Sequence, residues 1–246
     1  MDIIKTKSFE LAINTKGSEV SQKLAIVLPG RLDTKDYASC KSHIEYLADK
    51  GYFAVSFDPP GTWDSPGGIE LFTTTNYIKA VGEVIEYYGN KPTLLLGHSR
   101  GGSTASLAGA QHPHVIGLVC IMSSYGAPSA PNPKAVVAGV QMEYRDLPPG
   151  IQKTDKKKEF ALPLSYFTDG EQYDVLGVLK TCTKPKLLFY GIYDKFNSPE
   201  RVKEVYGIIP EPKMIHELNS EHDYRYHPEI ITEVNKTLGK FILKLE

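Results

Sequence analysis

A serine flanked by glycines follows an apolar run near the middle of the sequence, and a serine in that setting can act as a nucleophile. Leu94–Gly102 reads Leu-Leu-Leu-Gly-His-Ser-Arg-Gly-Gly, in which Gly97–Gly101 matches the pattern G-x-S-x-G. The pattern predicts a strand, a sharp turn and a helix, with the Ser99 hydroxyl exposed at the turn. The backbone N–H of Arg100 would open that helix, where it can donate to a negatively charged oxygen.

Length and charge limit what else the chain could do. It has 246 residues, with 28 Lys plus Arg against 29 Asp plus Glu and a formal net charge of −1. This length suits a single domain over residues 1–246 that buries a sizeable core. The near-neutral charge gives no reason to expect nucleic acid or an anionic membrane as a partner. We therefore expect a small-molecule substrate.

The spacing of the cysteines and the hydropathy of the sequence indicate in which cellular compartment the protein is expected. Cys40, Cys120 and Cys182 lie far apart without a C-x-x-C spacing, which favours buried reduced thiols over a disulfide framework or a zinc site. The first residues lack the apolar core of a signal peptide, and no stretch approaches the ~20 apolar residues of a membrane span. We expect a cytoplasmic protein.

The elements that must position Ser99 are apolar runs alternating with amphipathic stretches. Lys23–Leu28 is a near-continuous apolar run, typical of a strand buried on both faces, whereas Pro228–Leu245 has the spacing of an amphipathic helix. This alternation predicts an α/β fold, with a mostly parallel sheet and helices on both faces. Besides the strand and helix around Ser99, the expected strands are 8–13, 23–28, 52–57, 115–122, 186–190 and 213–218, and the expected helices are 36–50, 75–88, 198–205 and 228–245.

One segment interrupts this alternation. About sixty residues separate the expected strands at 115–122 and 186–190, far more than the ~2 to 6 residues of an ordinary connection. We interpret residues 124–183 as a small cap, with short helices at Ala135–Met142 and Tyr173–Leu179. The charged run Asp155–Glu159 is expected to be a plain exposed face rather than an anion site.

The serine motif, the alternating elements and the insertion together resemble the α/β-hydrolase family, in the branch with a cap before the strand that carries the acid. The resemblance implies a triad in the chain order serine, acid, histidine. Asp194 follows the expected strand 186–190 in a G-x-x-D loop that begins at Gly191, so it is the expected acid. Asp169 and Asp174 of the cap are the alternatives.

The expected histidine is His222, which lies between the last expected strand and the last helix. His216 falls inside the strand pattern and His227 precedes a proline at the helix start, so both are expected to be structural, whereas His112 and His114 are expected to be surface histidines. A neutral imidazole can take the proton of the serine hydroxyl, and the imidazolium that forms is stabilised by a buried carboxylate.

The resemblance also suggests where a second oxyanion donor lies. In the family it comes from the loop after the strand that here ends at Leu28, which makes the Arg31 backbone N–H the candidate. This loop has Pro29 in place of the family's frequent histidine, and the Arg31 side chain could instead bind a substrate carboxylate. In the loop after the strand 52–57, Asp58 is expected to be structural. Trp63 either lines the site or packs beneath the cap.

The resulting prediction is a cofactor-independent serine hydrolase, without metal, that cleaves a carboxylic ester or related acyl compound through an acyl-enzyme on Ser99. Thioesterase, lactonase, amidase and carbon–carbon bond hydrolase activities remain open, because one triad serves them all. A non-catalytic receptor for a small ligand on the same fold is the alternative from another class. The cap is expected to wall the acyl site with apolar and aromatic side chains, with Met142, Tyr144, Tyr166 and Phe167 as the candidates.

Overall fold

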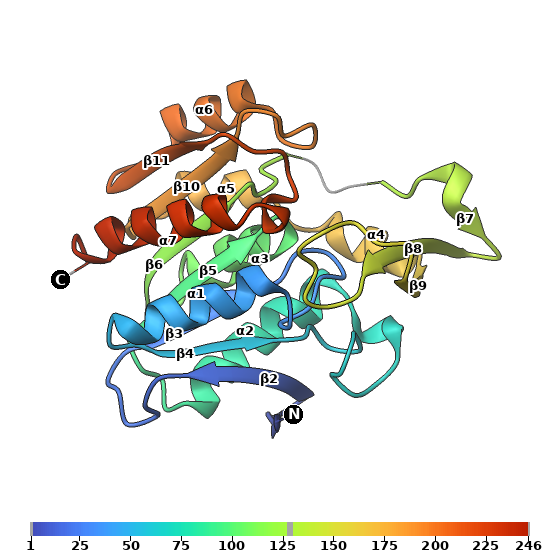
Figure 1. Cartoon of the computed structure of the whole chain (residues 1–246), viewed down its shortest axis with the longest axis horizontal. Helices are drawn as coiled ribbons and strands as arrows, with labels where there is room; N and C mark the ends of the chain where they lie inside the picture. Colours follow the sequence, from blue (N-terminus) through green and yellow to red (C-terminus); the bar gives the residue numbers. More distant parts are fainter. Residues whose placement is uncertain (1, 127–129, 246) are drawn as a thin grey trace.

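The central strands of the structure are the apolar runs of the sequence. The computed structural model describes residues 2–126 and 130–245, and its main sheet runs through the middle of the molecule (Figure 1). Every residue of β3 (Leu24–Leu28) and β4 (Phe53–Phe57) is buried. Such continuous burial is expected where helices cover both faces of a parallel sheet.

Within the described residues the main sheet has eight strands, in the order β1-β2-β4-β3-β5-β6-β10-β11. β1 pairs antiparallel with β2, and β2 with β4, whereas the other pairs are parallel. The expected α/β fold with a mostly parallel sheet is confirmed. The remaining strands of this sheet are β1 (Asp2–Lys5), β2 (Glu10–Lys16), β5 (Thr93–His98), β6 (Val115–Ile121), β10 (Lys186–Gly191) and β11 (Lys213–Leu218).

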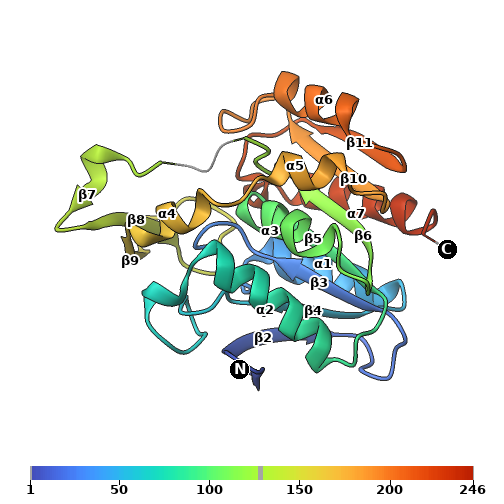
Figure 2. The same cartoon turned by 180° about the vertical axis from the view of Figure 1, so that it is seen from behind.

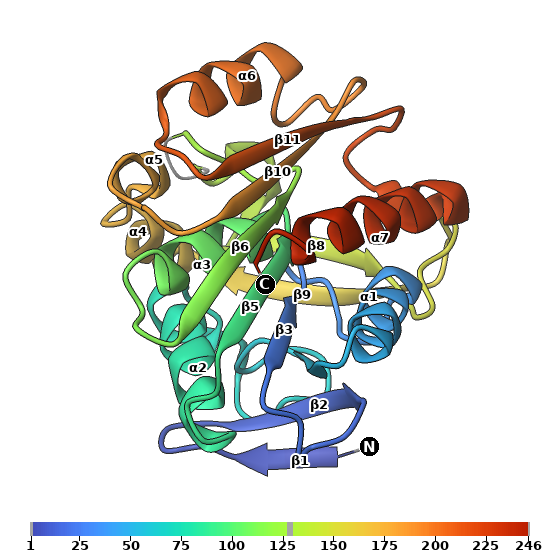
Figure 3. The ribbon, with the colours of Figure 1, turned by 90° about the vertical axis from the view of Figure 1, so that its left-hand side faces the viewer.

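Helices cover both faces of this sheet, as Figure 3 shows from the side. α1 and α7 lie on one face, where Leu47 and Val234 belong to a common apolar cluster. α2, α3, α5 and α6 lie on the other, where Val84, Ala105 and Val205 belong to a second cluster. Among the described residues, none of the helices has the length and apolarity needed to cross a membrane. The helices are α1 (Ala38–Asp49), α2 (Thr74–Tyr87), α3 (Arg100–Gly109), α5 (Val175–Lys180), α6 (Pro199–Ile208) and α7 (Pro228–Ile242), with short turns η1 (Ile69–Leu71) and η3 (Tyr224–Tyr226).

The insertion forms a small antiparallel sheet, so the helix expected at Ala135–Met142 is wrong. The turn η2 (Pro133–Ala135) leads into β7 (Val136–Val137), and β8 (Val140–Asp146) pairs with both β7 and β9 (Lys157–Pro163). Ala138 and Gly139 have φ values of 50° and 81°, which make a two-residue hairpin turn. A helix cannot pass through two consecutive residues with left-handed backbone.

The rest of the insertion is helical. α4 (Ser165–Gly170) follows β9, and α5 covers most of the helix expected at Tyr173–Leu179. Figures 1 and 2 show β7, β8, β9 and α4 beyond the end of the main sheet where β5 passes into α3. The limits of the cap, 124–183, stay a prediction, and residues 127–129 of that range lie outside the described part of the chain.

Candidate active site

Ser99 sits between β5 and α3 in an unusual backbone conformation. Its φ is 50° and its ψ is −116°, a combination that costs on the order of 1 to 3 kcal/mol for a residue other than glycine. Strand and helix are in close contact here, because a side chain at Gly97 would collide with the Gly101 backbone. The turn thus holds the Ser99 side chain at the carboxyl end of the sheet.

A chain of hydrogen bonds joins Ser99 to the two residues expected to act with it. The Ser99 Oγ lies 2.8 Å from the Nε2 of His222, and the Nδ1 of His222 lies 2.8 Å from the Oδ2 of Asp194. In the neutral ring, an Nδ1–H that donates to Asp194 leaves Nε2 free to accept the serine proton. The structure therefore brings together the three residues that the sequence singled out.

The surroundings of the Asp194 carboxyl keep this group ionised. Its side chain is only 1% exposed, and its Oδ1 accepts the backbone N–H groups of Phe196 and Asn197. Burial by itself raises the pKa of this carboxyl, but the hydrogen bond and charge of His222 with the two N–H donors hold the pKa below its ordinary value. Asp194 is therefore an anion at neutral pH, as the orientation of His222 requires.

The other acids and histidines named from the sequence bond elsewhere. Asp169 accepts hydrogen bonds from Thr75, and Asp174 accepts the backbone N–H that opens α5. His216 lies 2.7 Å from Glu233, and His227 contacts Glu221. The rings of His112 and His114 lie 5.9 Å apart and tilted in the connection before β6.

The two residues expected to donate to an oxyanion, Arg100 and Arg31, line the cavity that contains Ser99. Arg100 is the first residue of α3, where backbone N–H groups have no partner within the helix. Arg31 follows β3, and its carbonyl accepts a hydrogen bond of 2.9 Å from the Nε of Arg145 in β8. The Arg31 guanidinium donates to Glu143 at 2.9 Å, so its charge is already balanced by a carboxylate. A role for both N–H groups in an oxyanion hole stays a prediction.

Ser99 and His222 open into a cavity of about 520 Å³ between the main sheet and the insertion. Tyr144, Tyr166 and Phe167 line it, as expected. Two other residues named as substrate contacts are absent from this lining, and for Trp63 the structure has the packing beneath the cap that was the other expectation. Met142 is not a lining residue, and the Trp63 indole packs edge-on against Phe160 of β9 while donating to the Leu32 carbonyl at 2.8 Å.

A second group of residues, missed from the sequence, holds the His222 loop. The Nε2 of His98 lies 2.9 Å from the carbonyl oxygen of His222, and its Nδ1 lies 3.6 Å from the Oδ2 of Asp33. The Nε of Arg145 lies 3.7 Å from the other Asp33 oxygen. The insertion is thus linked to the His222 backbone through Asp33 and His98. His98 stands inside the G-x-S-x-G motif, which was the available signal, whereas nothing local marks Arg145 or Asp33.

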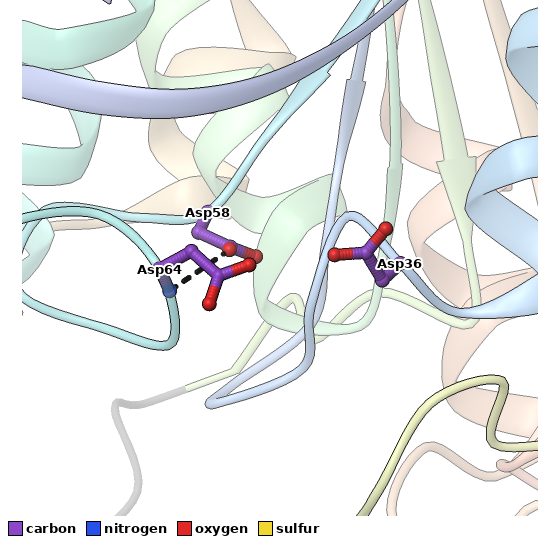
Figure 4. A group of neighbouring side chains, drawn as sticks. All are labelled: Asp36, Asp58 and Asp64. Atoms are coloured by element: carbon purple, nitrogen blue, oxygen red, sulfur yellow. Dashed lines mark hydrogen bonds between the residues drawn. The ribbon is translucent and has the colours of Figure 1, made fainter. Parts of the chain in front are cut away.

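An acidic cluster near the insertion could suggest a metal site. Asp58 and Asp64, from the loop after β4, face Asp36 from the loop before α1 (Figure 4), with carboxylate oxygens within 4.8 Å of one another. The Lys35 ammonium already occupies this space, because its Nζ lies 2.6, 3.2 and 2.9 Å from Asp36, Asp58 and Asp64. The cluster is therefore an internal ion-pair network, in keeping with the structural role expected of Asp58.

Replacing Lys35 with methionine should destabilise the fold by about 3 to 5 kcal/mol, because it leaves buried carboxylates without their cation. The side chains of Lys35 and Asp58 are 2% and 0% exposed. Burial by itself would raise the pKa of Asp36, but hydrogen bonds, first from Lys35, lower it to about 2. The stabilisation by ionised Asp36 is therefore present above its ordinary pKa and lost as the pH falls toward 2.

Urea unfolding at several pH values measures this effect. The wild-type free energy of unfolding should fall between pH 4 and pH 2, and the K35M variant should be weaker than wild type at pH 7. The Lys41 ammonium lies 3.0 Å from Asp36, and its side chain is half-exposed. The matched variant K41M should change stability by less than about 1 kcal/mol. Equal stability of K35M and wild type at pH 7 would contradict the account.

The comparisons with known proteins agree with the observed fold. A family model described as "alpha/beta hydrolase fold" matches residues 25–164. The curated protein "Palmitoyl-protein thioesterase ABHD10, mitochondrial" of Mus musculus is 23% identical over 214 residues, or 81% of this chain and 68% of that protein. The structure of Est1E from Butyrivibrio proteoclasticus with ferulic acid has a TM-score of 0.78 at 18% identity, covering 100% of this chain and 99% of that one. The structure of mouse alpha/beta hydrolase domain-containing protein 10 has a TM-score of 0.74 at 21% identity, with coverage of 100% and 99%.

The matched family region spans more than half of the chain. It includes the Ser99 turn and the strands on either side of it. The similar structures cover the chain from end to end, and at these identities they show the fold. The chain belongs to the alpha/beta hydrolase fold family, a family of hydrolytic enzymes.

Proposed function

We propose that the protein is a serine hydrolase that cleaves a carboxylic ester or a related acyl compound. The observation that carries the proposal is the hydrogen-bonded series Ser99, His222 and Asp194, with both links at 2.8 Å. A nucleophile, a base and an orienting carboxylate in this order are the parts that acyl transfer needs. A receptor that only binds a ligand would not need the strained backbone of a serine whose hydroxyl lies 2.8 Å from a histidine ring.

The reaction would proceed in two balanced halves. Ser99 Oγ attacks the acyl carbon while His222 Nε2 takes its proton, and the negative charge on the acyl oxygen is met by the N–H groups of Arg100 and Arg31. His222 then gives the proton to the departing oxygen or sulfur, which releases the alcohol or thiol and leaves an acyl-enzyme. A water molecule attacks that ester with His222 as the base, and the acid is released as Ser99 regains its proton.

A thioester is the second candidate substrate. The mouse relative carries the name of a palmitoyl-protein thioesterase, and the same residues can expel a thiol as readily as an alcohol. The expected cytoplasmic location stays a prediction, since the name of that relative includes a mitochondrial designation.

A panel of acyl compounds tests the proposal. 4-Nitrophenyl esters from acetate to decanoate, and thioesters of the same acids, should be cleaved by the wild type with a measurable kcat/KM for at least one series. The acyl length with the highest kcat/KM then defines the substrate class. Absence of turnover above the spontaneous rate for every ester and thioester would contradict the proposal.

His98 is expected to act as a positioning residue for His222. The variant H98F keeps an aromatic ring but loses the donor to the His222 carbonyl, so kcat should fall roughly tenfold to a hundredfold through a small displacement of the base. H98Q keeps an N–H donor and should recover part of that loss. KM for a short ester should change little in both. An unchanged kcat in H98F would show that the hydrogen bond from His98 does not position His222.

Substitutions of Phe167 and Tyr144 compare a residue that packs in the core with a residue that is expected to contact the substrate. Phe167 is 2% exposed and belongs to the main apolar cluster, so F167A should lower the free energy of unfolding by about 3 to 5 kcal/mol and slow all esters alike. Tyr144 is 49% exposed and lines the cavity. Y144A should leave the melting temperature unchanged and alter the relative rates across the panel. The reverse pattern in the two variants would contradict these roles.

A further inference from the structure

The charges around the cavity are unevenly paired. The lining carboxylates already lie within 4.0 Å of basic nitrogens: Asp33 beside Arg145 and His98, Glu143 beside Arg31 and Arg145, and Asp146 and Asp223 beside Arg225. Every carboxylate that lines the cavity therefore already has a basic partner, and a cation bound there would have to compete with that partner.

Two lining lysines have no such partner. Lys153 and Lys157 are exposed, and no carboxylate of the described residues lies within ion-pair distance of either. The Lys153 Nζ lies 5.9 Å from the centre of the Tyr226 ring, which also lines the cavity. Arg100 lacks a carboxylate as well, but its guanidinium donates to Thr74 and packs on the Tyr166 ring. The available positive charge at the cavity is thus the pair Lys153 and Lys157.

The two walls of the cavity differ in chemistry. The side formed by α3, α4 and α5 contributes the apolar side chains of Leu107 and Val175, together with the hydroxyl groups of Ser103 and Tyr173. The segment after β8, the first residue of β9 and the loop after β11 supply Lys153, Lys157 and Tyr226. α3 begins directly after Ser99, and His222 belongs to the loop after β11, so the bond between Ser99 and His222 joins the two walls.

We propose that the substrate carries an anionic group, a carboxylate or a phosphate, on its leaving-group half, and that Lys153 and Lys157 bind this group. The proposal rests on the proposed function. The side with Leu107 and Val175 takes the acyl half, so that the scissile bond lies at Ser99 between the two walls. An anion gains two unpaired cations without breaking any ion pair of the protein, whereas a cation meets no free carboxylate.

Matched esters test this assignment. 3-Carboxy-4-nitrophenyl butyrate has an anionic leaving group and 4-nitrophenyl butyrate has a neutral one, and each rate is divided by the spontaneous rate of the same ester. At low salt the wild-type kcat/KM should favour the carboxylated ester by roughly tenfold, a size consistent with two partly exposed ion pairs. The preference should shrink in 0.5 M NaCl, because salt screens such pairs.

Variants identify the residues responsible. The double variant K153Q/K157Q should abolish the preference for the carboxylated ester. The control K156Q/K180Q makes the same change of charge at exposed lysines outside the cavity lining and should retain the preference. The proposal is overturned if K153Q/K157Q keeps the wild-type ratio or if both double variants lose it equally. A preference for 4-nitrophenyl hydrogen glutarate over 4-nitrophenyl pentanoate, without one for the carboxylated leaving group, would also overturn it.

A binding measurement separates this proposal from the proposed function. Calorimetric titration of the reaction product 3-carboxy-4-nitrophenol, compared with 4-nitrophenol, requires no turnover. The wild type should bind the carboxylated phenol more tightly by roughly tenfold, and K153Q/K157Q should bind the two equally. Equal binding by the wild type would overturn the anion site even where the neutral ester is hydrolysed. Tighter binding without hydrolysis would support the site and contradict the catalytic role of Ser99.

Discussion

Replacing Ser99 with alanine is expected to reduce kcat by a factor on the order of 10⁵ to 10⁶, the largest effect of any single substitution in the protein. The alanine removes the atom that forms the acyl-enzyme, and neither His222 nor Asp194 can replace it. The rate that remains would come from binding and from the N–H donors beside the acyl oxygen. The measurement is kcat for the fastest ester of the panel.

The control for S99A is S124A. Ser124 also lines the cavity, and no hydrogen bond of its hydroxyl to the described residues is present in the structure. S124A should therefore keep a rate within a few-fold of the wild type. Melting temperatures of both variants show whether the fold is intact, and S99A should be no less stable, since removal of a polar group held at an active site often stabilises a fold. Retention of most of the activity by a folded S99A would contradict the mechanism.

Replacing Asp194 with asparagine should reduce kcat by on the order of 10⁴. The amide has nearly the shape of the carboxyl, but its NH₂ group can face Nδ1 of His222 and favour the ring form with its proton on Nε2. That form cannot accept the Ser99 proton. The variant also loses the negative charge that stabilises the imidazolium, so the loss should appear in kcat more than in KM.

The matched control for D194N is D169N. Asp169 was an alternative acid from the sequence, and it bonds Thr75 at the surface. D169N should keep nearly the wild-type rate. A D194N enzyme with most of its activity, together with a large loss in D169N, would move the orienting acid to the insertion and contradict the proposed triad.

The features predicted well from the sequence are those with a local physical cause. Strands such as β3 could be predicted because burial on both faces demands a continuous apolar run. The Ser99 turn could be predicted because only glycine permits the close approach of strand and helix around it. Asp194 and His222 follow strands of one parallel sheet, and such strands bring their carboxyl ends to a common edge. Their meeting at Ser99 therefore follows from the order of the elements.

The parts that could not be predicted depend on contacts between distant segments. The segment Ala135–Met142, expected to be helical, instead holds β7 and the start of β8, because the left-handed turn at Ala138 and Gly139 interrupts it. The link from Arg145 through Asp33 to His98 joins three segments with no shared local pattern. Lys157 belongs to a charged run that looks like any exposed face, and its place beside the cavity follows only from the pairing of β8 with β9.

The central claim is that Ser99 is the nucleophile, and covalent labelling tests it most directly. The protein is treated with a fluorophosphonate, digested and analysed by mass spectrometry, with residual ester hydrolysis measured in parallel. We predict a single modified serine, Ser99, with one label per inactivated molecule and no label in S99A or H222A. Labelling of another serine, or full inactivation without modification of Ser99, would contradict the account.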